Sequence, residues 1–119
     1  MNDTTTTLEQ LKTKLKQFVE ERDWQQFHSP KNLSMAIASE AAELLELFMW
    51  VDNKESVARL QEKRQEVEDE VADVILAVLA MASRYDIDVA QAIERKIKKN
   101  AQKYPVELVK GKWKKYNEY

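Results

Sequence analysis

Apolar residues recur along this chain at the three- and four-residue spacing of amphipathic α-helices. The two clearest stripes consist of Ile37, Ala41, Leu44, Leu45 and Phe48, and of Val67, Val71, Val74, Ile75 and Val78. A single glycine and two prolines leave few positions for the tight turns of β-hairpins. The pattern therefore predicts an all-α fold, which we expect to be a four-helix bundle.

Capping residues predict where the first two helices begin. Thr7 with Gln10 has the pattern of a capping box, which predicts a helix from residue 8 to about residue 22. The aromatic, poorly periodic segment that follows ends at Pro30, whose fixed φ suits the first turn of a second helix. That helix is expected to carry residues 33 to about 51.

The second half of the chain predicts two more helices. The most apolar segment, from about residue 66 to 85, predicts the third helix, and the charged residues 55–65 form either a short helix or its beginning. Asp88 with Gln91 predicts the start of a fourth helix, which should end before Pro105 because a proline disfavours helix in the residue before it.

Composition limits the class of protein. With 119 residues, of which 44% are hydrophobic and 34% charged, the chain suits one domain spanning residues 1–119. The absence of cysteine excludes disulfides, thiolate metal sites and a cysteine nucleophile, and it fits a cytoplasmic protein. The polar residues 1–7 do not resemble a signal peptide, and no apolar run approaches a membrane span, so we expect no membrane association.

Charge gives little reason to expect nucleic-acid binding. The formal net charge of −2 provides no general attraction to a polyanion. The one local candidate is a basic, aromatic tail, residues 106–119, which is a candidate arm for packing on a neighbouring subunit. Its basic and aromatic residues are Lys110, Lys112, Trp113, Lys114, Lys115, Tyr116 and Tyr119.

Two acidic pairs lie along the edges of the two apolar stripes. Glu40 and Glu43 in one segment, like Glu70 and Asp73 in the other, are three residues apart and therefore lie on nearly one helical face. The two pairs also have the same phase relative to their stripes, so packing of the stripes would bring the four carboxylates together. A set of oxygen ligands without imidazole or thiolate suits Mg²⁺, for which Mn²⁺ can substitute.

Other interpretations of these acids remain open from the residues alone. Acidic pairs at this spacing are common on solvated helix faces, and periodicity leaves surface charge and a metal site at about even odds. A helical interaction module, which binds a protein partner through the acidic face and the basic tail, is the alternative function. A di-iron bundle is excluded because such sites need two histidines and the chain contains only His28.

Four ordered motifs resemble those of the MazG-like all-α nucleoside triphosphate pyrophosphohydrolases. They are WQQFHSPKNL at 24–33, EAAELLELFMW at 40–50, EVADVIL at 70–76 and NAQKYP at 100–105. The similarity covers nearly the whole chain, and it is greatest to the dCTP pyrophosphatase branch of the family.

The resemblance implies hydrolysis of a nucleoside triphosphate, dCTP or a related pyrimidine nucleotide, to the monophosphate and pyrophosphate. It implies that residues matching Glu40, Glu43, Glu70 and Asp73 hold Mg²⁺ and form the catalytic centre. The motifs do not identify the general base, since metal-bound carboxylates are weak bases. Glu43 and Glu46 are candidates, although Glu46 lies far from the apolar stripe and is more simply interpreted as solvated or at a subunit contact. Similar proteins form homodimers or homotetramers, so we expect this chain to assemble in the same way.

Substrate contacts follow from the same resemblance. Trp24 and Trp50 correspond to tryptophans that border the pyrimidine ring, and stacking on an aromatic ring contributes roughly 1 to 3 kcal/mol per base. Without the resemblance, both would be interpreted as core aromatics. His28 is a further candidate contact, although a lone histidine is more often a surface or packing residue.

The expected fourth helix supplies candidate phosphate contacts. Lys96, Asn100 and Tyr104 place donors within about two turns, although a solvated basic face is the simpler interpretation. Two positions depart from the vertebrate dCTP enzymes: Leu15 stands where a histidine is expected to contact the base, and Ala77 stands where a tyrosine is expected. These departures bear on recognition of the base and leave the acidic motifs unchanged.

Overall fold

The structure is a computed structural model that describes residues 1–113 and 115–118. Helices and their connections account for all of these residues, and the described part of the chain contains no strand. The elements are α1 (Leu8–Glu21), η1 (Gln25–Phe27), α2 (Pro30–Glu46), α3 (Asn53–Glu62), α4 (Arg64–Arg84), α5 (Val89–Lys103), α6 (Val106–Val109) and η2 (Tyr116–Glu118), where η denotes a 3₁₀ turn.

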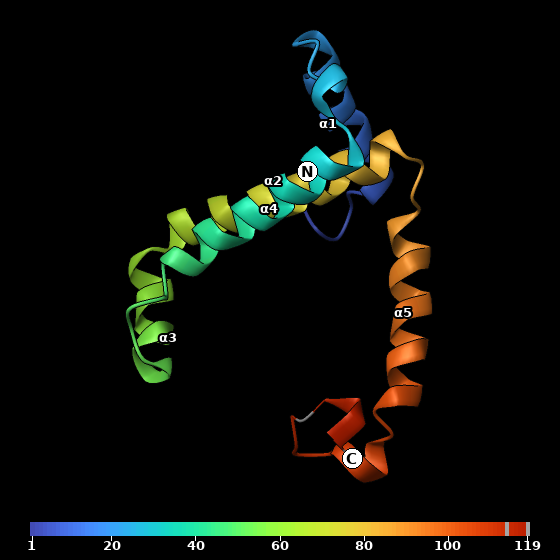
Figure 1. The fold of residues 1–119 in the computed structure, drawn as a ribbon. Helices are drawn as coiled ribbons and strands as arrows, with labels where there is room; N and C mark the ends of the chain where they lie inside the picture. Colours follow the sequence, from blue (N-terminus) through green and yellow to red (C-terminus); the bar gives the residue numbers. More distant parts are fainter. Residues whose placement is uncertain (114, 119) are drawn as a thin grey trace. The chain divides into compact units, whose positions relative to one another are not determined.

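The chain packs as two compact units, and each is described by itself. The first, Met1–Asp86, contains α1 to α4 (Figure 1). The second, Ile87–Tyr119, contains α5, α6 and η2. The expectation of one domain spanning the whole chain stays a prediction.

The prediction of an all-α fold is confirmed, but the number of helices differs from the four expected. Six α-helices lie in the described residues. Residues 53–62 form a helix of their own because the Asp52 side chain accepts a hydrogen bond from the Glu55 backbone N–H (2.7 Å) and Lys63 then leaves the helical conformation (φ −111°, ψ 28°). A single further turn, α6, follows Pro105.

Capping accounts for the helix starts that the sequence predicts. In α1, the Thr7 hydroxyl accepts from the Gln10 backbone N–H (3.1 Å), while the Gln10 side chain accepts from the Thr7 N–H (2.8 Å), which completes the expected capping box. Pro30 occupies the first turn of α2, as predicted. Asp88 caps α5 by accepting from the Gln91 N–H (2.9 Å).

The end of α2 was predicted wrongly, because the helix stops at Glu46 rather than near residue 51. The chain tightens there: the Phe48 N–H donates to the Leu45 carbonyl (2.9 Å), three residues back instead of four. The carbonyl of Leu47 accepts from Arg59 Nε (3.0 Å) on α3. A side chain twelve residues further along the chain therefore satisfies the end of this helix, which no local pattern reveals.

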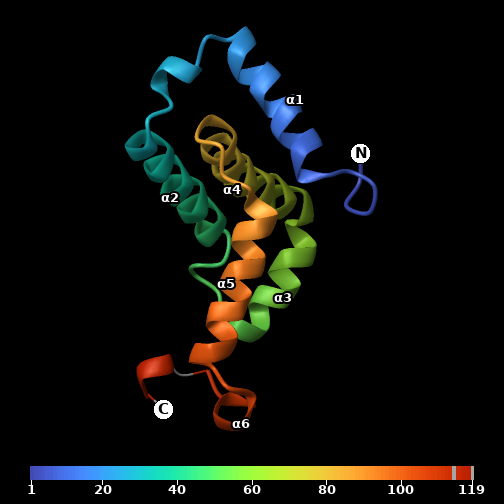
Figure 2. The same cartoon turned by 90° about the vertical axis from the view of Figure 1, so that its right-hand side faces the viewer.

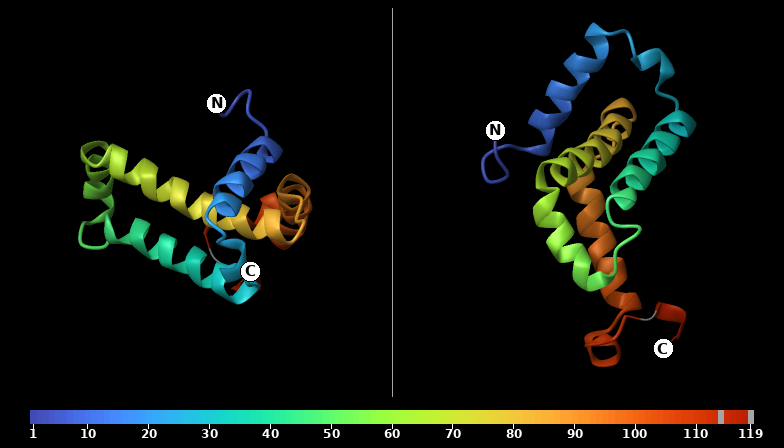
Figure 3. Two further views of the ribbon diagram at one scale, coloured as in Figure 1. Left: turned by 90° about the horizontal axis from the view of Figure 1, so that it is seen from above. Right: turned by 90° about the vertical axis from the view of Figure 1, so that its left-hand side faces the viewer.

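In the first unit, α4 is the helix against which α1, α2 and α3 all pack. Figures 1 and 3 show α2 and α4 side by side and antiparallel, with α3 connecting their ends. α1 lies against the C-terminal part of α4 (Figures 2 and 3). The buried apolar side chains are Val19, Leu33, Val67, Leu79 and Ala82.

The apolar stripe expected to form the core on α4 is only partly covered. Val67 is buried, but Val71 and Ile75 expose 41% and 48% of their surface and Val78 exposes 37%. The stripe is wider than the face that α2 covers, so its outer edge stays open. Helix α4 thus carries more apolar surface than the first unit buries.

Tyr85 links the end of α4 to the segment between α1 and α2. Its hydroxyl donates a hydrogen bond to the His28 carbonyl (2.7 Å), across 57 residues of sequence. This hydrogen bond connects the end of the η1 segment to the residue that follows α4.

The remaining sequence expectations about the ends of the chain are tested only in part. Trp113 of the basic tail is 95% exposed, whereas Lys114 and Tyr119 lie outside the described residues.

None of the helices among the described residues is both long enough and apolar enough to cross a membrane. The cytoplasmic location stays a prediction.

Replacing Tyr85 by phenylalanine should reduce the free energy of unfolding by about 1 kcal/mol, because it removes one hydrogen bond and leaves the His28 carbonyl without its partner. Chemical denaturation followed by circular dichroism measures the change. As a control, Thr13→Ala removes an exposed hydroxyl that bonds only to the Glu9 carbonyl of its own helix (2.9 Å). Equal effects of the two substitutions would contradict a special role for the Tyr85 link.

Candidate metal centre

Four carboxylates meet where α2 and α4 lie side by side. Glu40 and Glu43 come from α2, and Glu70 and Asp73 come from α4. One oxygen atom from each of the four lies within 4.8 Å of the others. The residues that share one helical phase in the sequence are therefore brought together in space.

Two of these carboxylates are poorly solvated. Glu40 and Glu70 are partly buried, and the Oε2 atom of each is buried without a hydrogen-bond partner. Partial burial, followed by the negative charge of Glu43, raises the pKa of Glu40 above its ordinary value. Partial burial, followed by hydrogen bonding with Glu43, raises the pKa of Glu70. If all four carboxylates are ionised, their mutual repulsion favours the binding of a proton or of a cation.

The donor set fits a hard divalent cation. It consists of carboxylate oxygens alone, which is the ligand type that Mg²⁺ and Mn²⁺ prefer. The unpaired Oε2 atoms of Glu40 and Glu70 would gain a partner from the cation. Buried polar atoms without partners are uncommon in folded proteins, so two in one cluster support a site that accepts a ligand.

Neither predicted stacking tryptophan is a core residue. Trp24, directly before η1, is 45% exposed and meets the Phe18 ring edge-on, with 5.8 Å between ring centroids and 74° between ring planes. Trp50 lies in the turns after α2 and is 89% exposed. Both are accessible to a ligand, and their role in stacking stays a prediction.

The predicted phosphate contacts lie in the second unit. Lys96 and Asn100 are one turn apart on α5, and Tyr104 follows the last residue of that helix. The Tyr104 N–H donates to the Asn100 carbonyl (2.8 Å). Their part in binding phosphate stays a prediction.

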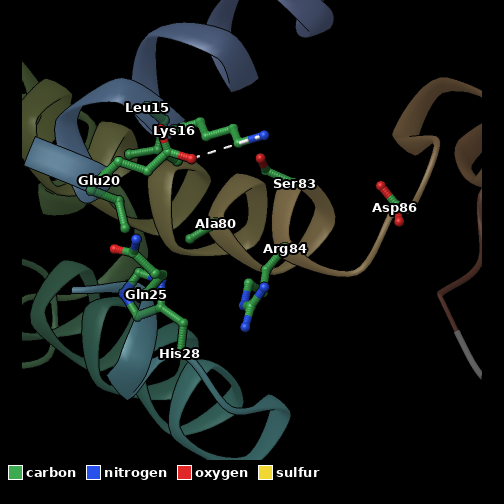
Figure 4. A pocket seen from close by; sticks show the side chains of 10 residues that line it. Leu15, Lys16, Glu20, Gln25, His28, Ala80, Ser83, Arg84 and Asp86 are labelled. Carbon is green, nitrogen blue, oxygen red and sulfur yellow. Dashed lines mark ion pairs between the residues drawn. The ribbon is translucent and has the colours of Figure 1, made fainter. Parts of the chain in front are cut away.

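A cavity of about 340 Å³ lies in the first unit, between α1, the η1 segment and α4 (Figure 4). His28, a predicted substrate contact, is one of its lining residues. The others are Leu15, Lys16, Val19, Glu20, Gln25, Ala80, Ser83, Arg84 and Asp86. The volume lies at the lower end of the range of small-molecule sites in proteins.

Sequence reasoning did not single out Gln25, which the structure places in this cavity. Its Oε1 atom is buried without a hydrogen-bond partner. The neighbouring Gln26 is exposed, and its Nε2 donates to the carbonyl and to the Oδ2 of Asp23 (2.9 and 3.1 Å). Two adjacent glutamines in a short 3₁₀ turn have no helical periodicity, so nothing in the sequence distinguishes them.

Comparisons with known proteins identify the family of this chain. The model of the MazG-like family matches residues 35–119. dCTP pyrophosphatase 1 of Mus musculus is 38% identical over 114 residues, which cover 94% of this chain and 67% of that protein. The corresponding human protein is 35% identical over the same shares of the two chains.

A solved structure extends the likeness to three dimensions. The crystal structure of a pyrophosphatase from Archaeoglobus fulgidus superposes with a TM-score of 0.81 at 37% sequence identity, covering 88% of this chain and 98% of that one. The resemblance that the four sequence motifs indicate is thereby confirmed, and this chain belongs to the MazG-like family.

Proposed function

We propose that this chain hydrolyses dCTP or a related pyrimidine nucleoside triphosphate to the monophosphate and pyrophosphate, with Mg²⁺ held at the acidic cluster. The observation that carries the proposal is the convergence of Glu40, Glu43, Glu70 and Asp73 within 4.8 Å. Membership of the MazG-like family, with relatives that are dCTP pyrophosphatases, supports the class of enzyme, a nucleoside triphosphate pyrophosphohydrolase.

The acidic cluster supplies a metal-binding surface at one end of the substrate. When bound, Mg²⁺ would neutralise the charge of the triphosphate and orient the α-phosphorus for attack by water. Glu40 and Glu70 would turn their buried oxygens to the ion, and Glu43 and Asp73 would complete the set of protein ligands. Mn²⁺, which accepts the same oxygen donors, would substitute.

A proton acceptor for the attacking water must lie near the cluster. Glu43 belongs to the cluster and is exposed, so water reaches it directly. Glu46, the last residue of α2, is also exposed and lies about one turn further along the same helix. We assign the general base to this pair and keep both as candidates.

The nucleoside is held by groups away from the metal. Trp24 and Trp50, both accessible, are the candidates for stacking on the base. They lie before and after α2, whose 17 residues span about 25 Å, so one copy of the chain would offer only one of them to a given base. His28 lines the cavity between α1, η1 and α4. Lys96, Asn100 and Tyr104, on α5 and directly after it, are the candidate phosphate contacts that the family resemblance implies. Stacking holds a base without reading its identity, so selectivity must come from hydrogen bonds.

A protein-binding module with an acidic face is the competing function. An acidic docking face needs carboxylates directed to solvent, whereas here an oxygen of Glu40 and an oxygen of Glu70 are buried without partners. This observation favours the enzyme.

Replacing Glu40 or Asp73 by alanine should lower the rate of pyrophosphate release by at least about 100-fold, because the charge of the triphosphate would lose its stabilisation. The assay follows pyrophosphate from dCTP with Mg²⁺. The matched control is Asp69→Ala, which removes an exposed acid of α4 whose Oδ1 accepts only from Gln65 Nε2 (3.0 Å). Full activity of the Glu40 and Asp73 variants would overturn the assignment in favour of the interaction module.

The metal-free protein should lose stability as the pH rises. The pKa values of Glu40 and Glu70 are raised in the folded state, so their contribution is fully present below the ordinary value of 4.5 and is lost as the pH rises through the raised values. Thermal melts in chelator between pH 4 and pH 8 measure this loss, and Glu70→Gln should flatten the curve.

Mg²⁺ should reverse the loss at neutral pH. At a concentration tenfold above its dissociation constant, the ion would stabilise the wild type by about 1.4 kcal/mol and the Glu70→Gln variant by less. A metal-free pH profile identical in the wild type and in Glu70→Gln, with no effect of Mg²⁺ on either, would contradict the site.

We further propose that the chain assembles as a homodimer or homotetramer. Val71, Ile75 and Val78 form an exposed apolar stripe on α4, and Met35 on α2 is 60% exposed. A second copy of the chain would remove this surface from water, which favours association. An exposed apolar stripe along a helix is typical of an interface.

The mass in solution should be that of two or four chains. Sedimentation or light scattering measures it directly. Ile75→Glu would place a charge on the exposed stripe and should lower the mass towards that of a monomer, whereas Asp69→Ala, on the same helix, should not. A monomeric wild type at micromolar concentration would contradict the assembly.

A further inference from the structure

We propose that Arg59 is a positioning residue of the nucleotide site: its hydrogen bond to the Leu47 carbonyl ends α2 and thereby sets the position of Trp50, a predicted stacking residue. The proposal rests on the nucleotide hydrolysis proposed above. It gives a side chain of α3, which lies outside the four sequence motifs, a part in binding the nucleotide.

The segment that follows α2 has the composition of a helix rather than of a turn. Residues 47–51 are Leu, Phe, Met, Trp and Val, without glycine or proline. Leucine and methionine are among the stronger helix formers, and the aromatic and β-branched residues are tolerated in helices. Local preference therefore favours a longer α2, and an interaction from outside the segment is needed to end the helix.

The backbone after α2 instead forms consecutive tight turns. The Phe48 N–H donates to the Leu45 carbonyl (2.9 Å), and the Val51 N–H donates to the Phe48 carbonyl (3.3 Å). Each of these hydrogen bonds spans three residues, as in a 3₁₀ turn, where the geometry is poorer than in an α-helix. Trp50 lies within these turns.

Arg59 holds the turns from α3. Its Nε donates to the Leu47 carbonyl (3.0 Å) across 12 residues of sequence, and this hydrogen bond is partly buried. Arg59 lies in the last turn of α3, whereas Asp52 caps the first turn by accepting from the Glu55 N–H (2.7 Å). The connection between α2 and α3 (Figure 2) is therefore attached to α3 at both of its ends.

The charge of Arg59 also suits the end of a helix. The last carbonyls of an α-helix carry a partial negative charge, which a nearby cation stabilises. Helix α2, all of whose residues the structure describes, has no basic side chain in its last turn. Arg59 thus supplies from another helix the donor and the charge that α2 lacks.

Trp50 depends on the backbone of these turns for its position. Its side chain is 89% exposed, so packing of the ring does not fix it. If α2 continued as a regular helix, each residue would turn by about 100° and rise by about 1.5 Å, which would move the ring from its present place. A stacking residue that is already in position binds a base without the cost of ordering the segment first.

The test compares two substitutions of nearly equal size. In Arg59→Gln, the amide nitrogen is as many bonds from the backbone as the arginine Nε, so the donor is kept and only the charge is lost. Arg59→Met has a methyl group there. With dCTP and Mg²⁺, Arg59→Met should raise KM by about fivefold or more, the lower end of what stacking of one base contributes. Arg59→Gln should keep KM within about twofold of the wild type.

The value of kcat separates positioning from general damage to the fold. Stacking on the base is remote from the reacting phosphorus and adds equally to binding of substrate and transition state. Arg59→Met should therefore leave kcat unchanged. The matched control is Arg64→Met, which removes an exposed arginine whose Nε pairs with Glu68 (3.7 Å) and should change neither constant.

A double-substitution cycle shows whether Arg59 acts through Trp50. Trp50→Ala should raise KM at least as much as Arg59→Met does. Adding Arg59→Met to Trp50→Ala should raise KM no further, because substitutions that remove the same interaction are not additive. If Arg59 only stabilised the fold, the two effects would add.

Four results would each overturn the proposal: an unchanged KM in Arg59→Met, an equal rise in Arg59→Gln, an equal rise in Arg64→Met, or additive effects in the double variant. If Arg59→Met does not fold, as judged by circular dichroism, Arg59→Gln decides: KM near that of the wild type supports the role of the donor, and a raised KM contradicts it. An unchanged KM in Trp50→Ala would overturn this inference and leave the hydrolysis intact. Absence of pyrophosphate release by the wild type would instead overturn the hydrolytic function.

Discussion

The mutual repulsion of four carboxylates is the constraint on which the rest of this structure depends. Two antiparallel helices, α2 and α4, bring one oxygen from each of Glu40, Glu43, Glu70 and Asp73 within 4.8 Å. Like charges this close oppose the packing of the helices. Partial burial, followed by the interactions with the neighbouring carboxyl groups, raises the pKa values of Glu40 and Glu70. A divalent cation bound among the four carboxylates would convert the repulsion into attraction, so the cluster is suited to metal uptake.

Helix α4 contributes to both the acidic cluster and the cavity of the first unit. It contributes two of the four acids, one wall of the cavity two turns later, and then Tyr85, which directly follows it and holds the η1 segment. A single helix therefore sets the spacing between the acidic cluster and the cavity. The same helix exposes an apolar stripe that the first unit leaves open.

Local patterns predicted the features that depend on neighbouring residues. The capping box of Thr7 and the cap at Asp88 lie within one helical turn of the backbone groups that they satisfy. Pro30 at the start of α2 has no backbone N–H that would need a partner. The end of α2 could not be predicted, because its last carbonyls depend on Arg59 of another helix. The extent of burial on α4 also escaped prediction, since a hydrophobic stripe does not reveal how much of it a neighbour covers.

The sequence by itself determined that the chain is helical and that two acidic pairs share one phase, because helical periodicity places residues three apart on one face. It also determined the family, through four ordered motifs. The tertiary structure decided that the two faces meet, that two oxygens of the cluster lack partners, and that Gln25 rather than Gln26 lines a cavity. These facts depend on which side chains from distant segments lie next to one another. Local periodicity does not contain that information.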